Sequence, residues 1–518
     1  MNELPLEVAY VRSPYDLAEI TSVEVNQALK LPGVVSVVKA KDIPGQNNAF
    51  GGADEFQLIA EEWVNYMGQI VAIVVAESAE IADEAASLIS VEYKPLPPIL
   101  GLPEADALNS THCKPEESIS ADNKPNDDEL TFFELKHSFQ GHRDLSDFGF
   151  VTAEPNGEGG FRIKSNNPGG DNASLALSKV LDLEKTQIHF ASSSENLSYK
   201  SAAMSCYPMF AIAALCASIT GKKIKVNPDS LFDGLNFIGC GSAEVVSSIG
   251  FDEKGKIKSF ESNIKLDCGS ELGSSRQFLS GYIRALKGVG ERAKLLIRFE
   301  QFKTNQMPSM SMEKDGLWIG LLVLEDAINQ IAKIRSESVN KSRESNMNPG
   351  KKYARLKKIY SKKIEEVEAF NLNNDRVKKG LYLFNVNLSN KPDQTKESKA
   401  NGALLSEVVI DGENESINLS YSNIVQEFNS RISYNQNRSI SVALFLEGLK
   451  CLQNKRLFNL DKVKVNLFPE ELFCDVISVN EETVESEDIS LCFSLGVHFA
   501  ILEAINQFDG KSPLAIGM

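Results

Sequence analysis

VRSPYDLAEITSVEVNQALKLPGVVSVVKAKDIPG, residues 11–45, and YMGQIVAIVVAESAEIADEAASLISVEYKPLPPIL, residues 66–100, decide the fold of this chain. The runs VVSVVKA and IVAIVVAE are rich in β-branched residues and have the length of strands. Ile81–Ile89 instead repeats apolar residues at helical spacing. Prolines shortly after this helix end the pattern. We therefore predict a small α/β domain over residues 1–107.

The rest of the chain continues the alternation of helices and strands that is typical of a mixed sheet. A polar, acidic linker is predicted over 108–130, and an α/β domain over 131–330. Residues 331–378 are rich in Lys, Arg and Glu and predict a charged helical connector. A last domain is predicted over 379–518. Its elements are strands at Gly380–Leu388, Leu404–Asp411 and Lys462–Leu467, and a closing helix.

The two N-terminal stretches resemble the a/b hammerhead domain of the xanthine dehydrogenase and aldehyde oxidase family, the molybdenum hydroxylases. The resemblance continues through GFDEKGKIKSFESNIKLDCG (Gly250–Gly269), SEVVID (Ser406–Asp411) and FSLGVHFAILEAI (Phe493–Ile505). It implies an α/β fold in which the hammerhead domain is followed by two molybdopterin-binding-type α/β domains. The second of these is shortened.

A substrate-binding loop of the family is present in altered form. The segment KTNQMPSMSMEKDGLWIGLLVLE (Lys303–Glu325) is similar to a loop that carries Ala-Phe-Arg-Gly-Phe-Gly in the family. Counting from the shared Lys-Thr-Asn, the family's arginine falls on Glu313. A guanidinium holds a substrate oxygen by paired hydrogen bonds, whereas a carboxylate repels it. Glu313 is therefore predicted not to bind substrate.

Two segments that the resemblance places around the cofactor are also altered. The family's Gly-Gly-Gln-Glu-His aligns with SFQGH, which keeps Gln140, the residue implied to face the metal, but puts Phe139 where the family has glycine. A hydrogen-bonded surface pair of Gln140 and His142 is the alternative. The glycine-rich phosphate loop aligns with SENLSYK, of which only Lys200 remains. At the positions where the family has glycine, this chain has side chains that would occupy the space of the cofactor. A positive φ at such a position costs roughly 1 kcal/mol per residue for a residue other than glycine.

The family's catalytic base is a glutamate in Gly-Glu-Pro, shortly before the C-terminal helix. If the alignment has no gap, Asp488 stands at the position of this glutamate. If the alignment has a gap, Glu487 stands there. A solvent-exposed acidic pair is the alternative interpretation. The family also carries a Gly-Gly-x-Glu-Met-Gly-Gln-Gly cofactor loop between the strand ending near Leu388 and SEVVID. In this chain the connection is too short to contain that loop.

The charge and composition of the chain exclude some classes of binding partner and some cofactors. A net charge of −17 disfavours nucleic acid and anionic membranes. The longest apolar run, Met209–Ile219, is too short to span a bilayer, and the first residues lack signal-peptide order, so a cytoplasmic location is predicted. Eight cysteines without a Cys-x-x-Cys spacing predict buried thiols and no metal site. We expect neither FAD nor a 2Fe-2S cluster in this chain.

These observations favour a degenerate homologue that does not catalyse a reaction and acts through protein–protein interaction. It would form a homo-dimer or a dimer with a related subunit, and no cofactor is then expected. The alternative is a molybdopterin-dependent oxidoreductase that hydroxylates an aldehyde or N-heterocycle, using Gln140, Lys200 and the Glu487 or Asp488 carboxylate. A binding module for another ligand is a third hypothesis. A gene model that skipped exons would produce the same losses.

Overall fold

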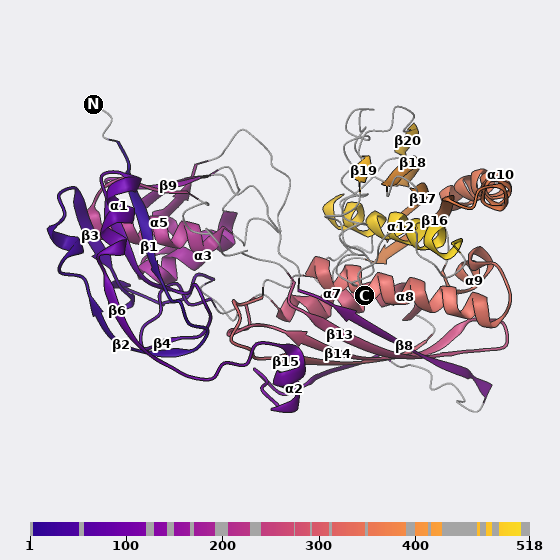
Figure 1. Ribbon diagram of the computed structural model, residues 1–518, viewed down its shortest axis with the longest axis horizontal. Coiled ribbons are helices and arrows are strands. Elements are labelled where there is room, and N and C mark those ends of the chain that lie inside the picture. Colours follow the sequence, from indigo (N-terminus) through magenta and orange to yellow (C-terminus); the bar gives the residue numbers. More distant parts are fainter. Residues whose placement is uncertain are drawn as a thin grey trace.

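The computed structural model describes residues 4–50, 56–120, 129–141, 150–165, 170–191, 206–227, 240–273, 275–290, 293–309, 313–347, 351–389, 399–412, 416–426, 464–466, 473–478 and 486–508. These residues form two lobes, which lie side by side in Figure 1. One lobe holds a seven-stranded sheet. The other holds a five-stranded sheet and the sheet of the last domain. The predicted mixed α/β fold class is confirmed.

The seven-stranded sheet is mixed and covered on both faces. Helix α1 (Ala79–Ser87) packs on one face, and α3 (Gly170–Leu181) and α5 (Tyr207–Thr220) pack on the other. Every residue of the interior strand β5 (Ile70–Ala76) is buried, as its continuous apolar sequence requires. The strand order is β11 (Ile188–Phe190), β10 (Phe161–Ser165), β9 (Val151–Pro155), β12 (Ile224–Val226), β1 (Leu6–Arg12), β5 (Ile70–Ala76) and β3 (Val34–Val38).

This sheet joins parts of the chain that the sequence analysis placed in separate domains. Strand β1, from 1–107, pairs in parallel with β12, from 131–330, with Leu6 opposite Ile224. The pairing satisfies the backbone groups along the second edge of β1, which local sequence patterns do not report. A separate three-stranded sheet completes the lobe, in the order β4 (Trp63–Val64), β2 (Ala18–Glu24) and β6 (Ser90–Pro95).

The five-stranded sheet lies under α7 (Arg276–Gly290) and α8 (Glu313–Ile334) (Figure 1). Its order is β7 (Glu116–Ser120), β15 (Lys294–Phe302), β14 (Ile257–Asp267), β13 (Ala243–Phe251) and β8 (Thr131–Phe139). The short helix α2 (Leu102–Ala107) ends directly before the predicted linker 108–130, and strand β7 lies within it. Residues 116–120, which lie within the range predicted as a linker, close the edge of β15.

The last domain packs on the upper face of α7 and α8. Its sheet has the order β16 (Val377–Ser389), β17 (Lys399–Asp411), β18 (Ser416–Gln426) and β19 (Lys464–Asn466), with β20 (Phe473–Ser478) also on β18. Helix α12 (Ser486–Asn506) lies between this sheet and α8 (Figure 1), and one hydrophobic core includes residues of all three. The predicted connector contains two helices, α9 (Val339–Asn346) and α10 (Lys351–Asn373).

A buried ion pair joins α8, α9 and the last domain. The guanidinium of Arg343 on α9 donates to the carboxylate of Glu325 on α8, and both side chains are 1% exposed. Tyr382 of β16 donates to the same carboxylate at 2.7 Å, and Asn340 accepts from Arg343 at 2.6 Å. Burial and then the Glu325 carboxylate raise the pKa of the Tyr382 hydroxyl. Such a pair needs all of these partners, because an isolated buried charge is costly.

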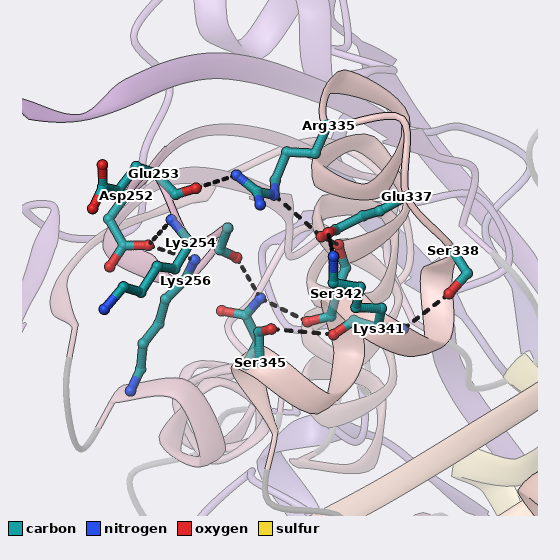
Figure 2. A network of polar contacts seen from close by, with 12 residues as sticks. Asp252, Glu253, Lys254, Lys256, Arg335, Glu337, Ser338, Lys341, Ser342 and Ser345 are labelled. Carbon is teal, nitrogen blue, oxygen red and sulfur yellow. Dashed lines mark hydrogen bonds and ion pairs between the residues drawn. The ribbon is translucent and has the colours of Figure 1, made fainter.

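Helix α9 also holds the turn between β13 and β14, as Figure 2 shows. Asn346 donates to the carbonyl of Gly255 at 2.8 Å and accepts from the amide of Ile257 at 2.7 Å. Arg335, just after α8, donates to the carbonyl of Glu253. Glu337 accepts from Ser342 at 2.6 Å, which holds the start of α9 in place. Helix α9 therefore connects the five-stranded sheet to the last domain.

Candidate functional site

The segment that begins Lys303-Thr304-Asn305 runs between the two lobes. Thr304 is 1% exposed, and its hydroxyl donates to Oδ1 of Asp267 at 2.7 Å. Its backbone amide donates to the carbonyl of Gly269 at 3.1 Å. Farther along, the amide of Ser309 donates to the carbonyl of Cys268 at 2.8 Å. The segment is thus fastened to the end of β14.

Asn305 fastens the same segment to the N-terminal lobe. Its side-chain oxygen accepts from the amide of Ile99 at 2.9 Å, and its side-chain nitrogen donates to the carbonyl of Asn65 at 3.1 Å. Nearby, the amide of Gln57 donates to the carboxylate of Glu271 at 2.7 Å, which adds a second polar link between the lobes. The Lys-Thr-Asn run therefore has a structural role at the junction of the lobes.

Asp267 is the buried acid of this junction. It is 3% exposed and accepts hydrogen bonds from Thr304 and from the amide of Gly269 at 3.0 Å. Burial raises the pKa of its carboxyl, and these hydrogen bonds offset the effect only in part. Asp267 therefore titrates above an ordinary aspartate.

Glu313, at the first position of α8, forms an ion pair within the protein. Its carboxylate lies 3.3 Å from Nη1 of Arg284 on α7, and Arg284 is 4% exposed. The two helices cross with their backbones in contact at this point. A Cβ atom on Gly281 would lie 1.8 Å from the carbonyl oxygen of Glu313, and one on Gly316 would lie 1.9 Å from that of Phe278. The charge of Glu313 is therefore balanced internally by Arg284.

Phe139 and Gln140 lie at the end of β8 and differ in environment. Phe139 is 6% exposed and stacks on His137, with ring centroids 6.1 Å apart and planes at 12°. It also meets Trp318 of α8 edge to face at 6.3 Å. The space that a glycine would leave here is filled by an aromatic ring. Gln140 follows the strand and is exposed.

The other predicted site residues are not brought together by the described part of the structure. His142, Glu195 and Lys200 lie outside the described residues. Glu487 and Asp488 lie in the first turn of α12. The sequence analysis placed them before that helix, so the helix begins earlier than expected. The position of their side chains is outside what the structure describes.

The region of the missing cofactor loop is a hairpin. Strands β16 and β17 pair in antiparallel register from Val377 opposite Asp411 to Ser389 opposite Lys399, with no shift between. Residues 390–398 are thus all that separates the two strands. The family's longer loop has no counterpart between them.

Sequence reasoning did not identify Arg284 or Asp267. Arg284 lies on a different helix from Glu313, and Asp267 is distant in sequence from Thr304. No local spacing predicts either pair. The arginine in the GYIRALKG run of α7 is the sequence signal that could have suggested a partner for Glu313.

Two family models match this chain. Residues 5–97 match the aldehyde oxidase and xanthine dehydrogenase a/b hammerhead domain. Residues 149–347 match the molybdopterin cofactor-binding domain. The chain belongs to the xanthine dehydrogenase and aldehyde oxidase family of molybdenum hydroxylases. The resemblance drawn from the sequence is confirmed.

Curated relatives in this family are much longer than this chain. Aldehyde oxidase 2 of Cavia porcellus is 26% identical over 353 residues, which is 66% of this chain and 26% of the relative. The indole-3-acetaldehyde oxidase of Arabidopsis thaliana is 26% identical over 380 residues, which is 70% of this chain and 27% of the relative. The matched part of the chain therefore spans about a quarter of the length of these relatives.

Solved structures of the family share the fold. The aldehyde oxidoreductase from Desulfovibrio gigas superposes with a TM-score of 0.77 at 13% identity, over 98% of this chain and 75% of that chain. Quinoline 2-oxidoreductase from Pseudomonas putida 86 has a TM-score of 0.75 at 14% identity, over 98% of this chain and 92% of that chain. These similarities show the shared fold, and the two family models give the order of a hammerhead domain followed by a molybdopterin-binding domain.

The structure shows what surrounds the two described positions that the sequence analysis aligned with a family glycine and with the family arginine. A phenylalanine ring occupies a glycine position beside Gln140, and an internally balanced glutamate occupies the arginine position. Within the described ranges, no three His, Cys, Asp or Glu residues gather as metal ligands. None of the helices searched there combines the length and apolar character needed to cross a bilayer.

Proposed function

We propose that this chain is a family member that neither retains molybdopterin nor hydroxylates a substrate, and that it works by binding another protein chain. The observation that carries the proposal is the ion pair of Glu313 and Arg284. A family site needs an uncommitted guanidinium there to hold a substrate oxygen. In this chain the guanidinium of Arg284 is buried and paired with the glutamate, at a crossing where the backbones of α7 and α8 are in contact.

Two further observations support the loss of the cofactor. Phe139 packs between His137 and Trp318 in the core and cannot turn away without leaving a cavity. The continuous register of β16 and β17 leaves only residues 390–398 for the family's cofactor loop. The hairpin and the phenylalanine are far apart in sequence, so they support the proposal independently.

The test is the metal content of the purified full chain after expression in a host that makes the molybdenum cofactor. We expect molybdenum at the background of the preparation, in a protein that melts cooperatively. A catalytically competent member of the family, expressed in the same host, is the positive control for cofactor supply. Stoichiometric molybdenum in this chain would contradict the proposal.

The alternative function is that of a molybdopterin-dependent oxidoreductase acting on an aldehyde or N-heterocycle. The match of residues 149–347 to the molybdopterin cofactor-binding domain favours it. Bound molybdopterin together with turnover that is lost in Gln140→Ala would establish this function. The matched control is Asn263→Ala, which changes another exposed amide on the five-stranded sheet and should keep full turnover.

A further inference from the structure

We propose that β8 is a docking strand through which two copies of this chain pair edge to edge, antiparallel, about a two-fold axis at Leu135. This inference rests on the proposed function, for which it names the surface that binds a partner. It is tested by the oligomeric state of the protein, whereas the proposed function is tested by its metal content.

Strand β8 is an outer strand of the five-stranded sheet. It pairs with β13 over its full length, from Thr131 opposite Phe251 to Phe139 opposite Ala243. Among the described residues, β13 is its only strand partner. Figure 1 shows β8 running along the lobe beneath α8. A straight edge of this length, without proline or a register shift, presents backbone groups that can pair with another strand.

The two faces of β8 differ. Phe133 and Leu135 point toward α8 and pack against the core while remaining partly exposed. Glu134 and Lys136 point to the outer face, with side chains 54% and 73% exposed. Phe132 lies on the same outer face and is 45% exposed. The strand therefore offers an apolar row and a charged row side by side.

The order of charges favours the one register in which Glu134 and Lys136 of the two copies face each other. A two-fold axis perpendicular to the sheet keeps each face on its own side, so odd residues meet odd residues and even meet even. With Leu135 on the axis, Glu134 of each copy faces Lys136 of the other, and the two Leu135 side chains meet. An axis at Glu134 or at Lys136 would instead place like charges opposite each other, which is unfavourable. The sequence of β8 is thus complementary to itself in this register.

The net charge of −17 does not prevent this pairing. Charges beyond about 8 Å are largely screened at physiological ionic strength, whereas cross-strand side chains lie about 5 Å apart. In the single copy, Lys136 lies 3.1 Å from Glu134 of its own strand. This exposed contact is worth little, so exchanging it for two contacts between copies costs little.

Charge reversal tests the proposal in sedimentation velocity runs on the full chain over a range of concentrations. We expect the wild type to dimerise, and both Glu134→Lys and Lys136→Glu to raise the Kd about tenfold or more, because each places two like-charged pairs across the axis. The double variant Glu134→Lys/Lys136→Glu restores opposite charges and should restore the dimer. Lys254→Glu, in the exposed β13–β14 turn, is the control for net charge and should dimerise like the wild type.

Three results would overturn the proposal. They are a wild type that stays monomeric at the highest concentration reached, a dimer that tolerates both single reversals, and single reversals that are not rescued by the double variant. Each of these can occur with or without molybdenum in the protein. Failure of the docking strand is therefore distinguishable from failure of the proposed function.

Discussion

Glu313 illustrates how one substitution is held in place by its surroundings. Replacing it with the family's arginine would set two guanidinium groups against each other at a crossing where α7 and α8 cannot separate. We expect Glu313→Arg to lower the free energy of unfolding by roughly 2 kcal/mol, since Arg284 is buried and Glu313 is only partly exposed. The measurement is the melting temperature of the purified variant.

The reciprocal variant separates charge from shape. Arg284→Glu/Glu313→Arg keeps opposite charges at the same crossing and should recover part of the lost stability. Glu313→Gln, which removes charge without adding repulsion, should fall between the wild type and Glu313→Arg. A Glu313→Arg protein as stable as the wild type would show that the ion pair does not shape this crossing.

Asp267 should make stability depend on pH in a defined direction. Its pKa in the folded protein is raised, so folding favours its protonated form. The stabilisation from this proton is complete below the unfolded value of about 4 and is lost as pH rises through the folded value. We expect Asp267→Asn to gain stability relative to the wild type as pH rises from about 4 toward neutrality. Melting temperatures across this range check it.

Asp252 provides a control of opposite sign. Burial alone would raise the pKa of its carboxyl. The amides of Lys256 and Lys254 and the ammonium of Lys258 outweigh burial, so the pKa is lowered. The stability that the Asp252 carboxylate contributes is present above its pKa in the unfolded state and is lost as pH falls through its pKa in the folded state. Asp252→Asn should therefore be destabilised near neutral pH and approach the wild type in acid. The same trend in both variants would contradict the assignment for Asp267.

Helix α9 joins α8, the β13–β14 turn and the last domain in the second lobe. Asn346 on this helix makes two hydrogen bonds to the β13–β14 turn and is buried. Asn346→Ala should cost roughly 2–3 kcal/mol, because the amide of Ile257 and the carbonyl of Gly255 lose their partner. Hydrogen exchange should show faster exchange of the Ile257 amide, and the melting temperature should fall.

Ser345 is the matched control on the same helix. Its hydroxyl donates to the carbonyl of Lys341 at 3.2 Å in an exposed position. Ser345→Ala should leave both measurements within error of the wild type. Equal effects of the two substitutions would mean that α9 contributes only as a helix and does not hold the turn.

Local patterns predicted individual elements better than their partners. The β-branched runs of β3 and β5 and the apolar repeat of α1 were visible in the sequence, and the structure has them at those positions. Strand β7 was missed, because its short polar sequence becomes a strand only through the edge of β15. The partner of Glu313 was missed for the same reason. Register and ion pairs between distant segments depend on the packed fold, and no periodicity encodes them.

In the molecule as a whole, Asn305 links the two lobes. Its side chain holds Asn65 of the N-terminal lobe and Ile99 of the segment between β6 and α2, while its neighbour Thr304 holds Asp267. Asn305→Ala should lower the free energy of unfolding by about 1–3 kcal/mol and speed exchange of the Ile99 amide. Gln306→Ala, which removes one exposed hydrogen bond to Leu100, is the control and should have little effect. Unchanged exchange at Ile99 would place the linkage elsewhere.

The shared core of α8 and α12 has a consequence for biosynthesis. Helix α12 is the last described element of the chain, yet residues such as Leu495 and Phe499 belong to the same core as α8. In a nascent chain that has been synthesised only up to α9, the apolar side of α8 that α12 covers is therefore exposed to water. Exposed apolar surface of this kind promotes aggregation until α12 has been synthesised and has packed. Premature termination should yield insoluble fragments in the cell.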